Sequence, residues 1–69
     1  MASASGHRLT GHELRKLRRD AELSQAAIAA RMGVARQRVT TLEQIAAPAP
    51  RLAERYVAAV AALLSEPDR

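Results

Sequence analysis

Residues 36 to 44 carry guanidinium, amide and hydroxyl side chains of the kinds that contact nucleic acids. They are Arg36, Gln37, Arg38, Thr40, Thr41 and Gln44. Amides and hydroxyls donate and accept hydrogen bonds at base edges, whereas guanidinium groups pair with guanine or with backbone phosphates. At about 100° per residue, Gln37, Thr40, Thr41 and Gln44 lie opposite the apolar pair Val39 and Leu42, with an arginine on each flank. A helix here would therefore present a polar face, edged with positive charge, that fits the major groove of DNA.

The preceding residues predict how such a helix is held. Ser24 is a good N-cap for a first helix, whose apolar face includes Ile28 and Met32. Gly33 can adopt the left-handed conformation that ends a helix, and the small Ala29 lets a second helix approach closely. We therefore expect a helix-turn-helix over residues 24–44.

The same run resembles the phage repressor and Cro (XRE-type) family of helix-turn-helix regulators. The matching elements are Leu14-Arg15, Leu17-Arg18, Leu23-Ser24-Gln25, Ile28-Ala29, Gly33-Val34, Arg36-Gln37, Val39 and Leu42-Glu43. The likeness covers roughly residues 9–46, and it implies an all-α, lambda-repressor-like bundle of four or five helices. Two positions depart from the family. Ala35 stands where Ser or Thr usually caps the recognition helix, and residues 44–48 replace the Asn-Gly pair that often closes it.

Within this face, groove chemistry assigns the base contacts to three residues. Gln37 can bond adenine through two hydrogen bonds, Arg36 can bond guanine, and the methyl group of Thr41 can pack on a thymine methyl. A second set is predicted to hold backbone phosphates, with the first amides of residues 25–32 contributing a helix N-terminus. The predicted phosphate contacts are Gln25, Arg38, Thr40 and Gln44.

The resemblance also implies an ion pair between Arg18 and Glu43, which would bridge the first and third helices from within. The alternative is two unrelated solvated charges, with Arg18 pairing locally with Glu22 four residues on. A partly buried pair need not add net stability, but removing one partner would leave the other uncompensated.

Two further helices are predicted outside the motif. A capping box at Thr10 and Glu13 begins a helix over about 11–21, with an apolar stripe and a basic outer face. Residues 46–50 form a proline-containing linker, and Pro50 suits the first turn of a last helix that ends near Ser65. We expect one domain over 9–66, a mobile tail at 1–8 and a short tail at 67–69.

The last helix has an apolar arc wider than one core requires. Beyond the stripe that closes the core, Ala53, Val57, Ala61 and Leu64 continue the arc. We expect a homodimer through Val57, Ala61 and Leu64, whose recognition helices would meet half-sites about 34 Å apart. Because alanine tolerates exposure to water, the alternative is a monomer that binds DNA alone or dimerises only on DNA.

Composition favours a small binding protein with an anionic partner. The chain has 69 residues, no cysteine and a formal charge of +4, and no apolar run approaches the ~20 residues that span a membrane. His7 and His12 do not form a metal-ligand pattern, and nothing supplies Ser24 with an oxyanion hole. We expect no enzyme activity, no cofactor, no small-molecule ligand and a cytoplasmic location in a prokaryotic or phage-infected cell.

The resemblance implies a transcriptional regulator that binds a double-stranded DNA operator. A small phage or mobile-element repressor that occludes a promoter is the leading hypothesis. An antitoxin-type autoregulator and a protein-interaction adaptor with the same fold are the alternatives. An adaptor would have no reason to keep Arg36, Gln37, Thr40 and Thr41 free of acids.

Overall fold

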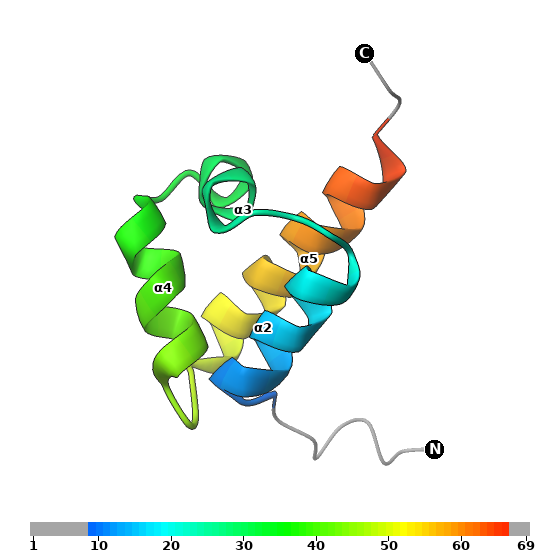
Figure 1. Cartoon of the computed structure of the whole chain (residues 1–69). Helices are drawn as coiled ribbons and strands as arrows, with labels where there is room; N and C mark the ends of the chain where they lie inside the picture. Colours follow the sequence, from blue (N-terminus) through cyan, green and yellow to red (C-terminus); the bar gives the residue numbers. More distant parts are fainter. Residues whose placement is uncertain (1–8, 67–69) are drawn as a thin grey trace.

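The computed structural model describes residues 9–66 as a bundle of helices, with no strand in that range. The four helices are α2 (Gly11–Asp20), α3 (Gln25–Met32), α4 (Arg36–Gln44) and α5 (Pro50–Ser65). α2 contacts α4 and α5, and α3 crosses one end of the bundle in contact with the same two helices (Figure 1). The all-α prediction and the expected helix spans are confirmed. The predicted tails, 1–8 and 67–69, lie outside the described residues.

The start of α2 is fixed by the predicted capping box. The Thr10 hydroxyl accepts a hydrogen bond from the Glu13 backbone amide at 3.1 Å, and the Glu13 carboxylate accepts one from the Thr10 amide at 2.9 Å. Two otherwise unpaired donors are thereby satisfied. Ser24 caps α3 in the same way by accepting from the amide of Ala27. Both caps were predicted from residue type alone.

The C-termini of α2 and α3 have the same hydrogen-bonded turn, but a different residue type takes the left-handed position in each. The amide of Leu23 bonds the carbonyl of Arg18, and Glu22 between them has φ +60°. After α3 the amide of Val34 bonds back to an α3 carbonyl, and Gly33 has φ +75°. Both are Schellman turns, which need one residue in the left-handed region. Glycine meets that need without strain, whereas Glu22 does not.

The C-terminus of α4 is closed by contact with the start of α2. Ile45 is extended, and its carbonyl accepts a hydrogen bond from the amide of Gly11 at 2.8 Å. A Cβ atom at Gly11 would lie 2.4 Å from the carbonyl oxygen of Leu42. The two helix ends can meet this closely only because residue 11 lacks a side chain. This contact closes the helix although residues 44–48 lack an Asn-Gly pair.

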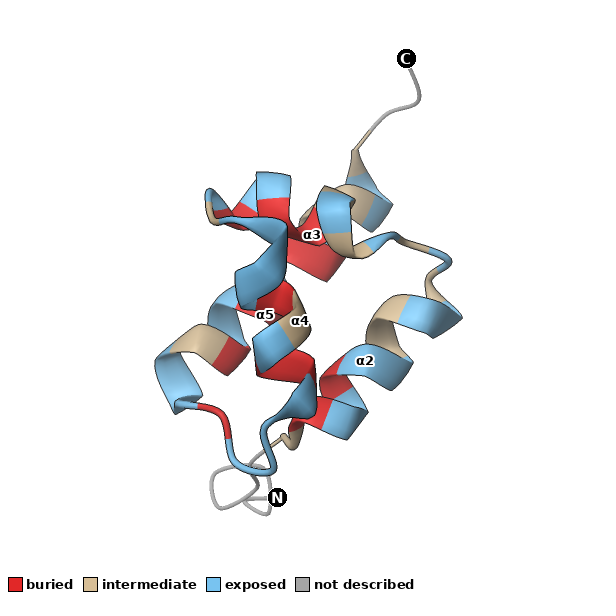
Figure 2. Ribbon diagram, turned by 60° about the vertical axis from the view of Figure 1, so that its left-hand side comes forward, coloured by how far each residue is buried: buried red, intermediate tan, exposed pale blue. Residues whose placement is uncertain are grey.

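The core lies where the inner faces of all four helices meet (Figure 2). It consists of Leu14, Ile28, Ala29, Met32, Val39, Leu42, Ala53, Tyr56, Ala59 and Val60. The placement of Ala53 in an outward strip is wrong, because this residue is buried within the domain. Of the remaining strip, Ala61 and Leu64 are exposed, whereas Val57 is half-buried and packs against the core.

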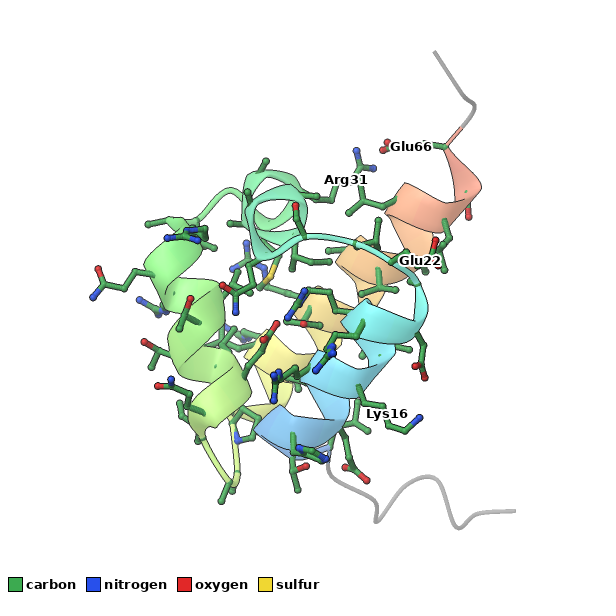
Figure 3. All side chains as sticks on the ribbon, in the orientation of Figure 1. Lys16, Glu22, Arg31 and Glu66 are labelled. Carbon is green, nitrogen blue, oxygen red and sulfur yellow. The ribbon has the colours of Figure 1, made fainter. Side chains whose placement is uncertain are left out.

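Two contacts attach α5 to the end of α3. The guanidinium group of Arg55 donates to the carbonyl of Met32 at 2.7 Å, which satisfies a carbonyl in the last turn of α3. Arg31 and Glu66 form an ion pair at 2.5 Å, and Figure 3 shows the two side chains approaching each other. Neither contact was predicted, because both join residues far apart in the sequence.

Candidate DNA-binding surface

α4 presents opposite faces to the core and to solvent. Val39, Leu42 and Glu43 are buried. The exposed residues are Arg36, Gln37, Arg38, Thr41 and Gln44. None of these five side chains forms a hydrogen bond or ion pair within residues 9–66, and no acidic side chain on α4 is exposed. The outer face of α4 therefore offers free donors, acceptors and two cations to an external partner.

The buried face of α4 carries one charge, the carboxylate of Glu43, and this residue is only 7% exposed. Arg18 of α2 donates to it through Nε at 2.7 Å and through Nη2 at 3.1 Å. Gln25 of α3 donates through Nε2 at 3.0 Å, and Tyr56 of α5 donates through its hydroxyl at 2.5 Å. Each of the other three helices thus holds α4 at one carboxylate.

The pKa values of this cluster follow from burial and hydrogen bonding. Burial raises the pKa of Glu43, but the hydrogen bonds from Arg18, Tyr56 and Gln25 outweigh it, so the pKa lies below its usual range. Burial, followed by the hydrogen bond to Glu43, raises the pKa of Tyr56. At neutral pH the cluster therefore holds a carboxylate, a guanidinium and a neutral phenol. Arg18 also donates to the carbonyl of Leu23, which ties the cluster to the start of the motif.

The geometry of α3, the turn at Gly33 and α4 is that of a helix-turn-helix. Comparison with protein families agrees with this geometry. A family model described as helix-turn-helix domain matches residues 10–68. The chain belongs to this family of XRE-like DNA-binding domains. Comparison with curated proteins and with solved structures finds no significant match.

In this helix-turn-helix domain α3 is the first helix of the motif and α4 is the second, the position that a recognition helix takes in such motifs. The structure brings Arg18 and Glu43 together as the resemblance implied, and Arg18 does not take the local alternative at Glu22. The three residues predicted to contact bases, Arg36, Gln37 and Thr41, share the exposed side of α4. Ala35 precedes them without a side-chain cap, as its residue type predicts.

Two of the predicted phosphate contacts have internal partners. The hydroxyl of Thr40 donates to the side-chain oxygen of Gln25 at 3.0 Å, and the amide of Gln25 donates to Glu43. Both residues are half-buried. Their spacing gave no signal of this link, because it spans the turn of the motif. Arg38 and Gln44 remain exposed.

Tyr56 is a member of the Glu43 cluster that the sequence did not predict. It is the one tyrosine of the chain and lies on the apolar stripe of α5. A buried tyrosine hydroxyl needs a partner, which is a general signal, but nothing in the sequence names Glu43 as that partner. Over residues 9–66 no cluster of ligating side chains could hold a metal ion, and none of the helices is long and apolar enough to cross a bilayer.

Proposed function

We propose that this helix-turn-helix domain is a sequence-specific repressor that binds double-stranded DNA through α4 and occludes a promoter. The supporting observation is the outer face of α4, where amides, a hydroxyl and guanidinium groups are exposed together and have no side-chain partner within the described residues 9–66. A helix of this size fits the major groove, in which each base pair shows a distinct pattern of donors and acceptors. The cluster at Glu43 holds the helix in one orientation for that contact.

Three residues are assigned to bases. Gln37 bonds an adenine, Arg36 bonds a guanine and the methyl group of Thr41 packs on a thymine, with each good pair worth roughly 1–3 kcal/mol of discrimination. All three are exposed near the start or middle of α4. They are the part of the surface that would set the operator sequence.

A second group is assigned to phosphates. Arg38 and Gln44 are exposed on α4, and Gln25 lies at the N-terminus of α3, where backbone amides favour an anion. The amide nitrogen of Gln25 has two hydrogens, so it can hold a phosphate while it donates to Glu43. Thr40 supports this arrangement through its bond to Gln25. These contacts would set affinity without setting sequence.

We also propose a homodimer through the exposed side of α5. Leu64 is 61% exposed, and Val57 and Ala61 line an apolar groove of about 360 Å³ together with residues of the linker. A two-fold pairing would cover this surface and set two recognition helices about 34 Å apart on an inverted repeat. Sedimentation of the free protein tests it, and a monomer at tens of micromolar bound to a non-palindromic site would contradict it.

The decisive experiment selects bound duplexes from a random pool and repeats the selection with two matched variants. Gln37→Ala should relax the preference at one base position. Gln44→Ala removes another exposed glutamine from the same helix and should weaken all duplexes alike. An unchanged base-by-base preference in Gln37→Ala would contradict the assignment, and failure of the wild-type protein to enrich any duplex would refute the function. Transcription from a promoter that overlaps the selected site should fall as the protein is added.

A further inference from the structure

The outer surface of α2 carries a strip of two arginines and a histidine beside α4. This α2 strip consists of His12, Arg15 and Arg19, which are all exposed. With Lys16 and Asp20 they line a shallow hollow of about 420 Å³. None of the three strip side chains forms a hydrogen bond or ion pair within residues 9–66. The side chains of the strip are therefore available to bind an external anion.

The direction in which the strip faces follows from Arg18. On α2, Leu14 points into the core and Arg18 bonds Glu43 of α4, so Arg18 marks the side of α2 next to the recognition helix. At about 100° per residue, Arg15 lies about 60° beyond Arg18 and Arg19 about 100° beyond it, in the direction away from the core. The strip thus continues the solvent-facing surface of α4 across the junction between the two helices.

The charges on α2 are divided between two sides. Lys16 is paired with Asp20 at 3.1 Å and extends away from α4 in Figure 3. Glu13 is held in the capping box at the start of the helix. The acids of α2 therefore do not neutralise Arg15 or Arg19, and the side that adjoins α4 carries only positive charge.

We propose that the α2 strip binds the phosphates that border the major groove occupied by α4, on the same duplex. This inference rests on the proposed function. Packed helices lie about 8–10 Å apart, and the major groove is about 12 Å wide, so a helix beside one centred in the groove lies over its phosphate wall. Arginine side chains on that helix reach a phosphate by extension alone. An acidic protein surface is the competing occupant, but the continuity with α4 favours DNA.

The test compares two double variants that remove equal charge. Arg15→Ala with Arg19→Ala alters the strip. Lys16→Ala with Arg31→Ala removes two exposed cations that are already paired with acids, Lys16 on the side of the hollow that extends away from α4 and Arg31 on α3. Binding of the selected duplex and of a scrambled duplex is measured at graded salt, together with ethylation interference on the selected duplex. Circular dichroism melting checks that both variants remain folded.

The strip variant should lower the slope of log K against log salt by about 1.8, since each phosphate contact contributes about 0.9. Affinity for both duplexes should then fall about 60-fold at 0.1 M salt and about 20-fold at 0.2 M. Interference should disappear at phosphates beside the groove, while the paired-cation variant stays near the wild-type slope.

Equal slopes for the two variants would overturn the strip proposal while leaving the role of α4 intact. So would unchanged DNA binding accompanied by loss of binding to a polyglutamate probe. A wild-type protein that binds no duplex would refute both the strip and the proposed function.

Discussion

The carboxylate of Glu43 offers the sharpest test of how the recognition helix is held, and Glu43→Gln is the smallest change that removes its charge. The substitution keeps the shape of the side chain but replaces one acceptor oxygen by a donor. Arg18, whose side chain is 13% exposed, then loses its counter-charge. Each carboxylate oxygen accepts two of the four hydrogen bonds to the group, so two donors lose their acceptor whichever oxygen is replaced.

Removal of one partner from a buried ion pair destabilises a protein by about 3–5 kcal/mol. Arg18 keeps its bond to the carbonyl of Leu23 and some contact with water, so the lower value, about 3 kcal/mol, applies. A domain of this size has a free energy of unfolding of only about 3–10 kcal/mol. The melting temperature of Glu43→Gln should therefore fall by about 12–24 °C.

The assay is urea and thermal unfolding of a double-mutant cycle. Arg18→Met removes the uncompensated cation, so the double variant should regain at least about 1 kcal/mol over the sum of the single changes. Single effects that add within about 0.5 kcal/mol would show that the two groups do not interact, and would refute this account of the cluster.

The acid dependence gives a second readout of the same variant. Because the folded pKa of Glu43 lies below its unfolded value, its contribution is fully present above the unfolded pKa of about 4.3 and is lost as the pH falls through the folded pKa. The stability difference between the wild type and Glu43→Gln should therefore shrink below about pH 4. A difference that stays constant across this range would contradict the lowered pKa.

Three further predictions concern the backbone and the phenol. Glu22→Gly should raise the free energy of unfolding by about 1 kcal/mol, because it removes the strain of a left-handed residue with a side chain. Gly33→Ala should lower the free energy of unfolding by a similar amount, although there is open space for the Cβ atom, because it introduces that strain. Urea unfolding of both variants checks the two signs. Gly11→Ala should cost about 1–3 kcal/mol because its Cβ would overlap the carbonyl oxygen of Leu42, and a melting temperature at or above the wild type would contradict that. Because the pKa of Tyr56 is raised in the folded state, wild-type stability should decline above about pH 10, where the unfolded phenol ionises. Tyr56→Phe should show no such decline. Unfolding at graded alkaline pH compares the two proteins, and near-ultraviolet absorbance follows ionisation of the single tyrosine.

The parts of the fold that could be predicted are those set by neighbouring residues. Thr10 and Glu13 begin α2, Ser24 begins α3 and Gly33 ends it, because caps and left-handed turns depend on contacts within three or four positions. The outer face of α4 could be predicted for the same reason, since residues half a helical turn apart lie on opposite sides of a helix.

The contacts that could not be predicted join separate helices. The pairing of Arg18 with Glu43 was expected only through the resemblance, and nothing local indicated that Tyr56 would join it. Ala53 was placed outward because a helical wheel gives directions but not the neighbours that cover them. The close approach at Gly11 depends on where α4 ends in space, which no spacing along the chain encodes.

The meeting of three helices at the Glu43 carboxylate has a consequence for how new specificities could arise. The groups that orient α4 lie on its inner side, and the residues proposed to contact bases lie on its outer side without bonds to that cluster. Substitution of Gln37 or Thr41 would therefore change the operator without changing the support. The outer face of α4 could therefore be varied in a library and screened for new DNA targets while the rest of the domain stays unaltered.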